Sequence, residues 1–447
     1  MKKILLLIIV LAAIIVGVPY YYGYQAEQTY RGYVDLFNKN SAMPGKIIAY
    51  DRGIWSSTAT TEVPLGLLTV KFQHKIFHGP VIIDTSAEKP NGLQFAMAVI
   101  RSAPDLSETQ YNEVHKAFGD LDPLSWKSVI ALNGSLETFV HSPAIDYKTD
   151  TGALISWKGL QGQLSIDKDH KTIKGNFTFP GLSVNSQTFN GEIQGLNFQV
   201  DQKRSNLDLW LGKALLGIDK ILINQQDKKI EVSSLKFDGE VENQNQNQLL
   251  DIMWTMDLTQ AVTPLGIYGP IDVLIKLLNM DPEALKLLKD VHPNQIGNQE
   301  IPKFIIKKFL LKSPTLVIEN TRLTLPEGNV TINAKLSVGG GNIPDNFDDS
   351  IYMSTLDGNL AVELPKEIFE KGFRQVIFQN VTKDPEYNSM TSDQQKAEID
   401  RQLTQKLEKF KSNGLLNEQG NSYLIKFSVV KGKIMANDKE VPISDLN

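Results

Sequence analysis

The chain of 447 residues contains no cysteine. Disulfide bonds, thiolate metal ligands and cysteine nucleophiles are therefore all excluded. An exported protein of this size that lacks disulfides is more typical of a bacterial envelope than of a eukaryotic secretory pathway. Common catalytic motifs are absent as well: the sequence holds no Gly-x-Ser-x-Gly elbow, no phosphate-binding loop, no dinucleotide glycine fingerprint and no His-Glu-x-x-His motif. We therefore expect no cofactor and no metal ion.

Charge of one sign is not in large excess. The 46 basic and 51 acidic residues leave a formal net charge of -5. Nucleic-acid-binding domains usually present a strongly basic surface, because they neutralise phosphates. The mild acidity of this chain argues against a nucleic-acid partner.

The first part of the chain lacks charge altogether, since no charged side chain occurs between Ile4 and Ala26. At about 1.5 Å per helical residue, roughly 20 apolar residues cross the hydrocarbon core of a bilayer. Lys2 and Lys3 precede this run, which predicts a cytoplasmic N-terminus. Four tyrosines follow the run, where an interfacial aromatic belt is expected: Tyr20, Tyr21, Tyr22 and Tyr24. We therefore predict a single-pass anchor over residues 1–24 in the bacterial inner membrane, with the bulk of the chain in the periplasm.

Two alternatives to an anchor are open at this level. A cleaved signal peptide also begins with a short basic region and an apolar core. However, the apolar run ends in Val18-Pro19-Tyr20, which differs from the small-x-small pattern of a cleavage site. The other alternative is a buried helix of a soluble protein, which is less consistent with the length of the apolar run.

Beyond the anchor, alternating apolar and polar residues indicate β-strands separated by polar turns. Asn133-Gly134 is a strong hairpin signal between two such runs, and Asn190-Gly191 and Asp238-Gly239 are weaker ones. Ser107 and Gln110 have the spacing of a capping box ahead of a helix. We therefore predict a β-dominated α+β fold, in which a long, curved antiparallel sheet is partly wrapped by helices.

Changes in periodicity divide the chain into regions. A membrane-proximal helix and linker are expected at residues 25–45. A helical stripe is predicted over Ile271, Leu274, Ile275 and Leu278, followed by an N-cap at Asp281. The regions predicted after the linker are a β-rich region at 46–265, a helical segment at 266–312, a β segment at 313–364, a helical segment at 365–414 and a C-terminal hairpin at 415–447.

The most distinctive local pattern is Tyr50-Asp51-Arg52-Gly53-Ile54-Trp55-Ser56-Ser57. An extended strand would place Tyr50, Arg52 and Ile54 on one face, and Asp51, Gly53, Trp55 and Ser57 on the other. Arg52 then has two interpretations. It binds an anionic head group or a partner's carboxylate, or it pairs with a strand neighbour or stacks on Tyr50 or Trp55. General experience with single arginines favours the second interpretation.

Two histidines, His74 and His78, are four residues apart, a spacing that on a helix would suit a metal ion. The alternation around them predicts a strand instead. At roughly 3.3 Å per residue, the two side chains would stand about 13 Å apart, too far to share an ion. We therefore expect both to be structural or solvated histidines.

Three features together resemble a known family. They are the Tyr-x-Arg-Gly-x-aromatic-x-Ser stretch at 50–57, the His78-Gly79-Pro80 triplet, and a C-terminal hairpin that ends in Ile443-Ser444-Asp445-Leu446. With the N-terminal anchor, they are similar to the YdgA-like family of bacterial envelope proteins, a domain of unknown function. The resemblance implies a Gram-negative inner-membrane protein with its bulk in the periplasm, and it carries over no catalytic residue. The motif positions, whose role is open, are Tyr50, Arg52, Gly53, Trp55, Ser57, His78, Gly79 and Pro80.

The leading hypothesis from the sequence is a non-enzymatic envelope factor that binds a lipid, a peptide or a protein on an apolar sheet face. Its expected partners are the bilayer, through the N-terminal helix, and a lipid or an envelope protein. One alternative is an envelope hydrolase or transferase built on His78 and nearby carboxylates such as Asp84. The other alternative is a structural spacer. No oligomeric state follows from the sequence.

Overall fold

The computed structural model contains two compact units. Unit 1 comprises Met1–Ser205, Lys213–Asp219 and Asn224–Gln226, and unit 2 comprises Asn206–Gly212, Lys220–Ile223 and Asp227–Asn447. The strand β14 (Trp210–Gln225) contributes residues to both units. The residues that the structure describes are 2–40, 44–65, 68–83, 93–226, 228–244, 249–289, 303–339, 355–383, 385–430, 432–437 and 439–441.

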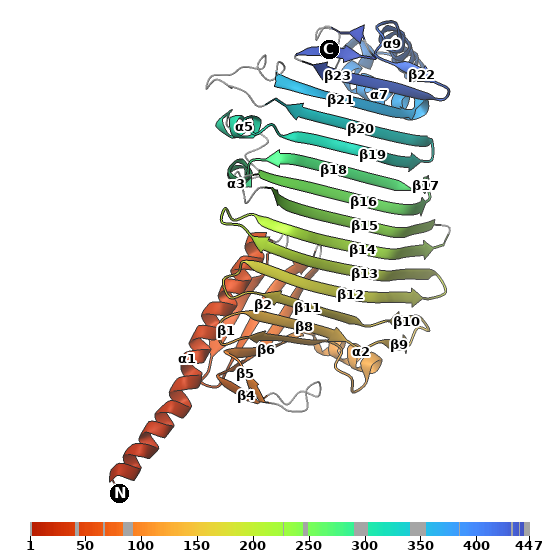
Figure 1. Ribbon diagram of the computed structural model, residues 1–447. Coiled ribbons are helices and arrows are strands. Elements are labelled where there is room, and N and C mark those ends of the chain that lie inside the picture. The colour runs from red at the N-terminus through yellow and green to blue at the C-terminus, as the bar shows by residue number, and fades with distance from the viewer. Residues whose placement is uncertain are drawn as a thin grey trace. The chain divides into compact units, whose positions relative to one another are not determined.

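Unit 1 begins with one long helix, α1 (Lys2–Asn40), and continues in an antiparallel sheet (Figure 1). Backbone registers join its main strands in the spatial order β1, β2, β3, β6, β7, β8, β11, β12 and β13. Their bounds are β1 (Lys46–Arg52), β2 (Ser56–Leu65), β3 (Leu68–His78), β6 (Ala98–Pro104), β7 (Ser125–Ile130), β8 (Leu136–Ser142), β11 (Leu160–Ile166), β12 (Thr172–Asn185) and β13 (Phe189–Arg204). Two smaller strands, β4 (Val81–Ile83) and β5 (Leu93–Phe95), form a separate two-stranded sheet. Two others, β9 (Ile145–Lys148) and β10 (Leu154–Trp157), pair with each other, and β10 also pairs with β12. The second helix of this unit is α2 (Glu108–Phe118).

The helix α1 packs on the sheet of unit 1 along a narrow stripe. Gly23, Ala26 and Tyr30 are buried and recur at intervals of three and four residues, which places them on one face of the helix. The helix contacts β1, β3 and β6, and the Tyr33 hydroxyl donates a hydrogen bond to the Gly134 carbonyl oxygen over 2.8 Å. Among the residues whose side chains the structure describes, no helix is both long and apolar enough to span a membrane.

Unit 2 is built on long antiparallel strands that lie side by side in the order β15, β16, β18, β19, β20, β21 and β23 (Figure 1). These strands are β15 (Lys228–Gln244), β16 (Leu249–Thr263), β18 (Ile271–Met280), β19 (Thr315–Leu325), β20 (Gly328–Val338), β21 (Leu356–Pro365) and β23 (Ser422–Val430). Short strands complete the sheet: β17 (Gly266–Tyr268), β22 (Asn417–Gln419), β24 (Lys433–Ala436) and β25 (Lys439–Glu440). The helices are α3 (Pro282–Lys289), α5 (Lys303–Leu310), α7 (Lys366–Val381), α8 (Pro385–Asn388) and α9 (Ser392–Ser412).

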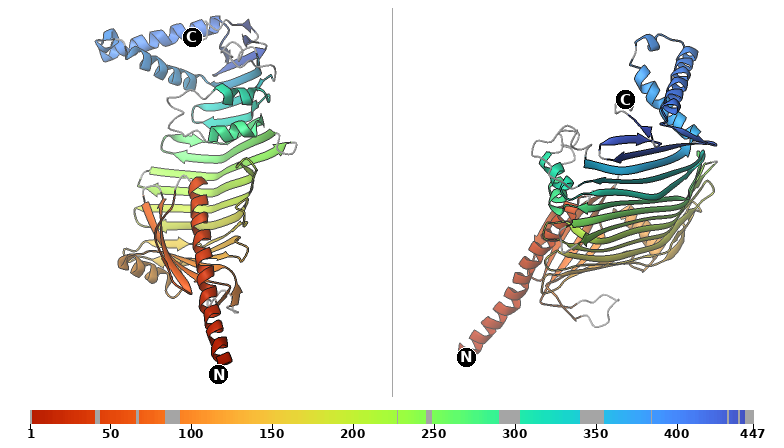
Figure 2. Two further views of the ribbon diagram at one scale, coloured as in Figure 1. Left: turned by 90° about the vertical axis from the view of Figure 1, so that its left-hand side faces the viewer. Right: turned by 45° about the horizontal axis from the view of Figure 1, so that its top comes forward.

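The main buried core of unit 2 lies where the paired helices α7 and α9 meet β21 and β23. The two helices project to one side of these strands (Figure 2). Ile377 and Leu403 from the two helices pack against Tyr423 of β23, which is 1% exposed. The Tyr423 hydroxyl donates a hydrogen bond to Glu370 Oε1 over 3.0 Å. Burial and this carboxylate together raise the pKa of Tyr423 to about 12.

The structure confirms the predicted β-dominated α+β fold with a large antiparallel sheet. The hairpin at Asn133-Gly134 joins β7 to β8, with Gly134 at a φ of 89°. The capping box of Ser107 and Gln110 opens α2. Asp281 caps α3, because its Oδ1 accepts a hydrogen bond from the Ala284 amide over 2.8 Å.

Three predictions of local structure are wrong. The stripe at Ile271–Leu278 lies on a strand, β18, because apolar residues on both faces of a strand also satisfy helical spacing. Asp238-Gly239 lies inside β15, opposite Thr255 and Trp254 on β16, and makes no turn. Asn190-Gly191 lies inside β13, and the turn precedes Phe189. The Ile443–Leu446 tail lies outside the described residues.

Candidate functional site

The Tyr50–Ser57 motif forms a hairpin and is not one extended strand. The strand β1 ends at Arg52, the chain turns, and β2 begins at Ser56, with Arg52 opposite Ser57 in the register. The Gly53 amide donates a hydrogen bond to the Ser56 carbonyl oxygen over 3.0 Å. A Cβ on Gly53 would lie 2.5 Å from that oxygen, so only glycine fits. The turn brings Arg52 and Ser57 to one end of the sheet.

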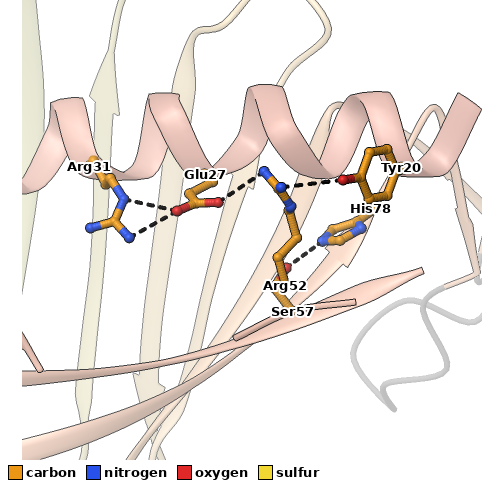
Figure 3. A network of polar contacts seen from close by, with 6 residues as sticks. All are labelled: Tyr20, Glu27, Arg31, Arg52, Ser57 and His78. Atoms are coloured by element: carbon orange, nitrogen blue, oxygen red, sulfur yellow. Dashed lines mark hydrogen bonds and ion pairs between the residues drawn. The ribbon is translucent and has the colours of Figure 1, made fainter. Parts of the chain in front are cut away.

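Arg52 reaches from this hairpin to α1 (Figure 3). Its Nη1 lies 3.3 Å from Glu27 Oε2, and its Nη2 donates to the Tyr20 hydroxyl over 3.4 Å. The guanidinium also lies over the rings of Tyr20 and Tyr24, at 5.2 Å and 5.4 Å from their centroids. Neither interpretation of Arg52 drawn from the sequence included these partners, which lie on α1, a helix that precedes the motif.

The Glu27 carboxylate also holds Arg31 on the same helix. Arg31 donates from Nε and Nη2 to Glu27 Oε1, over 3.1 Å and 2.9 Å (Figure 3). The Arg31 guanidinium lies 5.3 Å from the centroid of the Tyr50 ring. One carboxylate therefore joins two guanidinium groups, and the cluster carries a net positive charge.

The His78 ring lies between α1 and Ser57, and the Ser57 hydroxyl lies 2.8 Å from Nε2 (Figure 3). Its Nδ1 lies 2.9 Å from the Ile54 carbonyl oxygen. Because a carbonyl oxygen only accepts, Nδ1 carries the proton and Nε2 accepts from the Ser57 hydroxyl. Burial lowers the pKa of His78, despite the opposing effect of this backbone hydrogen bond.

His74 has a similar environment further along the same strand. Its Nε2 lies 2.6 Å from Thr61 Oγ1, and its Nδ1 lies 2.7 Å from Ser102 Oγ. Burial lowers the pKa of His74 to about 4. Both histidines are thus held neutral between hydroxyl or carbonyl partners. Within the described ranges, no cluster of histidine, aspartate and glutamate has the arrangement of a metal site.

Two glycines allow the close packing around His78. A Cβ on Gly23 of α1 would lie 2.4 Å from the His78 ring, so the helix approaches the sheet at this point. A Cβ on Gly79 would lie 1.8 Å from the Ala96 carbonyl oxygen, and the Gly79 amide donates to the Met97 carbonyl oxygen over 2.8 Å. The peptide bond between Gly79 and Pro80 is cis. The motif position Gly79 therefore serves backbone packing.

The Ser57–His78 pair resembles a nucleophile and its general base in distance alone. Ser57 is 2% exposed and His78 is 4% exposed, so a substrate has no access to the hydroxyl. His78 Nδ1 contacts the Ile54 carbonyl oxygen, where a catalytic triad would have a carboxylate. Asp84, which the sequence suggested as a companion carboxylate, lies outside the described residues. The pair therefore fastens the hairpin to β3 in this structure.

The partners on α1 follow a signal that sequence reasoning overlooked. Tyr20, Tyr24, Glu27 and Arg31 recur at intervals of three and four residues, as do the buried residues beside them. This spacing marks a helix face that packs on protein. Pro19 is also buried, so the face begins within the predicted anchor.

A second candidate surface lies on unit 2. Residues that pair directly across antiparallel strands share a face of the sheet. The registers of β15 to β21 place apolar side chains opposite one another on one face of these strands. The side chains of this apolar face are Leu235, Phe237, Ile252, Trp254, Met256, Leu258, Ile271, Val273, Ile275, Leu277, Leu316, Ile318, Leu336 and Leu360. None of them is buried, and Trp254 is 48% exposed.

The opposite face of the same strands is different in character. It carries charged side chains, among them Lys236, Asp257, Asp272, Lys276 and Lys335. Lys276 forms an ion pair with Glu319 over 2.7 Å. The charged side chains of this face contact water, although Glu240 and Val317 on the same face are buried. The apolar face exposes a contiguous surface that water disfavours.

Comparison with protein families matches residues 1–444 to a family described as "Bacterial protein of unknown function (DUF945)". No curated protein and no solved structure matches the chain. The finer resemblance to YdgA-like proteins stays a prediction. Because the match spans nearly the whole sequence, the protein belongs to the bacterial family DUF945.

Proposed function

We propose that this protein is a non-enzymatic envelope factor that binds the acyl chains of lipids on the apolar face of unit 2. The observation that carries the proposal is the half-exposed state of that face over β15 to β21. A monomeric protein rarely leaves so large a contiguous apolar surface in water. Each methylene group that the face removes from water contributes about 0.8 kcal/mol.

The chemistry of the face favours an acyl chain over a peptide. A peptide that binds a sheet in extended form usually pairs with backbone groups at a sheet edge. The apolar face presents side chains such as Met256, Val273 and Ile275, whose packing needs no hydrogen-bonding partner. An acyl chain has no polar groups to satisfy, so it matches this surface.

The proposal includes attachment to the bacterial inner membrane, with an N-terminus in the cytoplasm and the bulk of the chain in the periplasm. The uncharged run from Ile4 supports it. Since Pro19 and Gly23 pack on unit 1, the membrane segment in this proposal ends at Val18, earlier than residue 24. The uncharged segment Ile4–Val18 is then about 22 Å long at 1.5 Å per residue, shorter than the roughly 30 Å hydrocarbon core.

Photocrosslinking of the full chain in intact cells tests the proposal. Cells that incorporate p-benzoylphenylalanine at position 256 are fed a ¹⁴C-labelled fatty acid, irradiated, and the protein is purified under denaturing conditions. We expect at least tenfold more ¹⁴C on the protein than with the probe at position 255. Thr255 is the matched control, because it lies on the same strand and faces the opposite side of the sheet.

A second comparison separates loss of binding from loss of folding. Ile275→Asp places a charge on the apolar face beside Trp254, and Leu274→Asp places one on the opposite face of the same strand. Only Ile275→Asp should abolish the crosslink from position 256. Equal labelling at positions 255 and 256 would reject lipid binding and favour a structural spacer, and a crosslink to a second polypeptide would favour a protein partner.

A further inference from the structure

The strands β4 and β5 lie at the end of unit 1 from which the first part of α1 extends (Figure 1), and they carry large exposed apolar side chains. Trp55 is 54% exposed and Phe95 is 67% exposed. Together with the other exposed apolar and tyrosine side chains of α1, the β1–β2 turn, β4 and β5, they form a set that we call the aromatic patch. The aromatic patch consists of Tyr20, Tyr21, Tyr24, Ile54, Trp55, Val81, Leu93 and Phe95.

Specific contacts hold the parts of the patch together. Arg52, which directly precedes the turn at Ile54 and Trp55, lies over the rings of Tyr20 and Tyr24. The His78 amide donates a hydrogen bond to the Trp55 carbonyl oxygen over 2.9 Å. The helix and the turn are therefore parts of one surface.

The small sheet of β4 and β5 extends this surface just after His78. Val81 pairs with Phe95 in its register, so both side chains point to one face. Ile82 points the other way and packs with Ala96 and Val99, with only 4% of its surface exposed. The sheet is thus anchored by one face and leaves Val81 and Phe95 uncovered.

We propose that the aromatic patch seats unit 1 in the interfacial layer of the bilayer, between the lipid head groups and the acyl chains. This inference rests on the proposed membrane anchor. The first residue of the patch, Tyr20, comes two residues after Val18, and a helix rises about 3 Å over that distance, so Tyr20 lies at the depth where the apolar run ends. Tyrosine and tryptophan prefer this layer, because each has an apolar ring and a polar group.

The aromatic patch is continuous with the uncharged run of α1, and this continuity favours the bilayer as its partner. A protein partner or a second copy of the chain would need a face that is free of the membrane, whereas this patch adjoins a segment whose proposed surroundings are the bilayer itself. The guanidinium of Arg52 sits among the tyrosines, where anionic lipid phosphates would be its nearest external counter-charges.

Site-directed spin labelling tests the seating, and the absence of native cysteine makes each label unique. The full-length protein is reconstituted into vesicles of phosphatidylethanolamine and phosphatidylglycerol with a nitroxide on Trp55→Cys, Phe95→Cys or Leu121→Cys. Leu121 is the matched control, since it is 54% exposed in unit 1 and lies in the turn after α2. We expect collision rates with a water-soluble nickel complex at least threefold lower at 55 and 95 than at 121. Equal rates at the three positions would overturn the proposal.

A fourth label, on Val10→Cys, separates failure of the seating from failure of the anchor. If position 10 is accessible to oxygen and shielded from nickel while 55 and 95 behave like 121, the anchor stands and the seating is wrong. If position 10 is also exposed to nickel, both proposals are wrong. Shielding at 10, 55 and 95 together supports both.

Discussion

Arg52 on β1 and Glu27 on α1 form an ion pair in which Nη1 lies 3.3 Å from Oε2. The two residues are 25 positions apart in the sequence. Glu27 also accepts two hydrogen bonds from Arg31, so a single carboxylate serves two guanidinium groups. Removing Glu27 and removing Arg52 are therefore unequal changes.

Glu27→Ala should lower the free energy of unfolding by about 2 kcal/mol, because it leaves two guanidinium groups near each other without their carboxylate. Arg52→Ala should lower it by only about 1 kcal/mol, because Glu27 keeps Arg31 as its partner. Urea unfolding of both variants and of the double variant measures the coupling. Equal losses for the two single variants would contradict the shared carboxylate.

Gly23→Ala should loosen the contact between α1 and the sheet. The new Cβ would lie 2.4 Å from the His78 ring, so the ring or the helix must move. We expect a net loss of about 1–2 kcal/mol in the free energy of unfolding, after the gain in helix propensity. Trypsin should also cleave faster after Arg31.

The matched control is Gly17→Ala on the same helix, where the new Cβ would meet no atom within 4 Å. This substitution should leave the rate of cleavage after Arg31 unchanged and should raise the free energy of unfolding by up to about 1 kcal/mol, the gain in helix propensity. A stable, protease-resistant Gly23→Ala variant would show that the close approach of α1 to His78 is unimportant.

His74 should make stability fall as the pH is lowered. Its pKa is about 4 in the folded protein and 6.5 in the unfolded chain, so below pH 6.5 the unfolded chain binds a proton that the folded protein does not. The stabilising contribution is complete above pH 6.5 and is lost as the pH falls toward 4. By linkage, the loss between pH 7.5 and pH 5 is about 2 kcal/mol.

The measurement is the free energy of unfolding in urea at the two pH values, for the native chain and for His74→Gln. Glutamine keeps an amide donor and acceptor for Thr61 and Ser102 but does not titrate. The difference between pH 7.5 and pH 5 should be about 2 kcal/mol smaller in the variant. The same difference in both proteins would rule out His74 as the titrating group.

The strands of this fold were predictable wherever one face is polar. The alternation around His74 gave β3, and the turn signal at Asn133-Gly134 gave the β7–β8 hairpin. The prediction failed at β18, where Leu274 and Leu278 put apolar side chains on the second face as well. Periodicity cannot separate a strand that is apolar on both faces from a helix, and the deciding information is the pairing with β16 and β19.

The candidate site was predictable in its residues but not in its partners. The motif identified Arg52, Ser57 and His78, and the structure places all three near α1. The pairing of Glu27 with Arg52 was not predictable, because Glu27 directly follows an uncharged run whose pattern is typical of a membrane segment. Which helix face meets the sheet depends on a long-range contact, and only the spacing from Tyr20 to Arg31 pointed to it.

The helix α1 runs as one element from Lys2 to Asn40, and its second half is fixed to unit 1 by Glu27 and Tyr33. The two halves belong to one helix, in which Pro19 removes a single backbone hydrogen bond. The surroundings that orient residues 2–18 therefore also influence the tilt of unit 1.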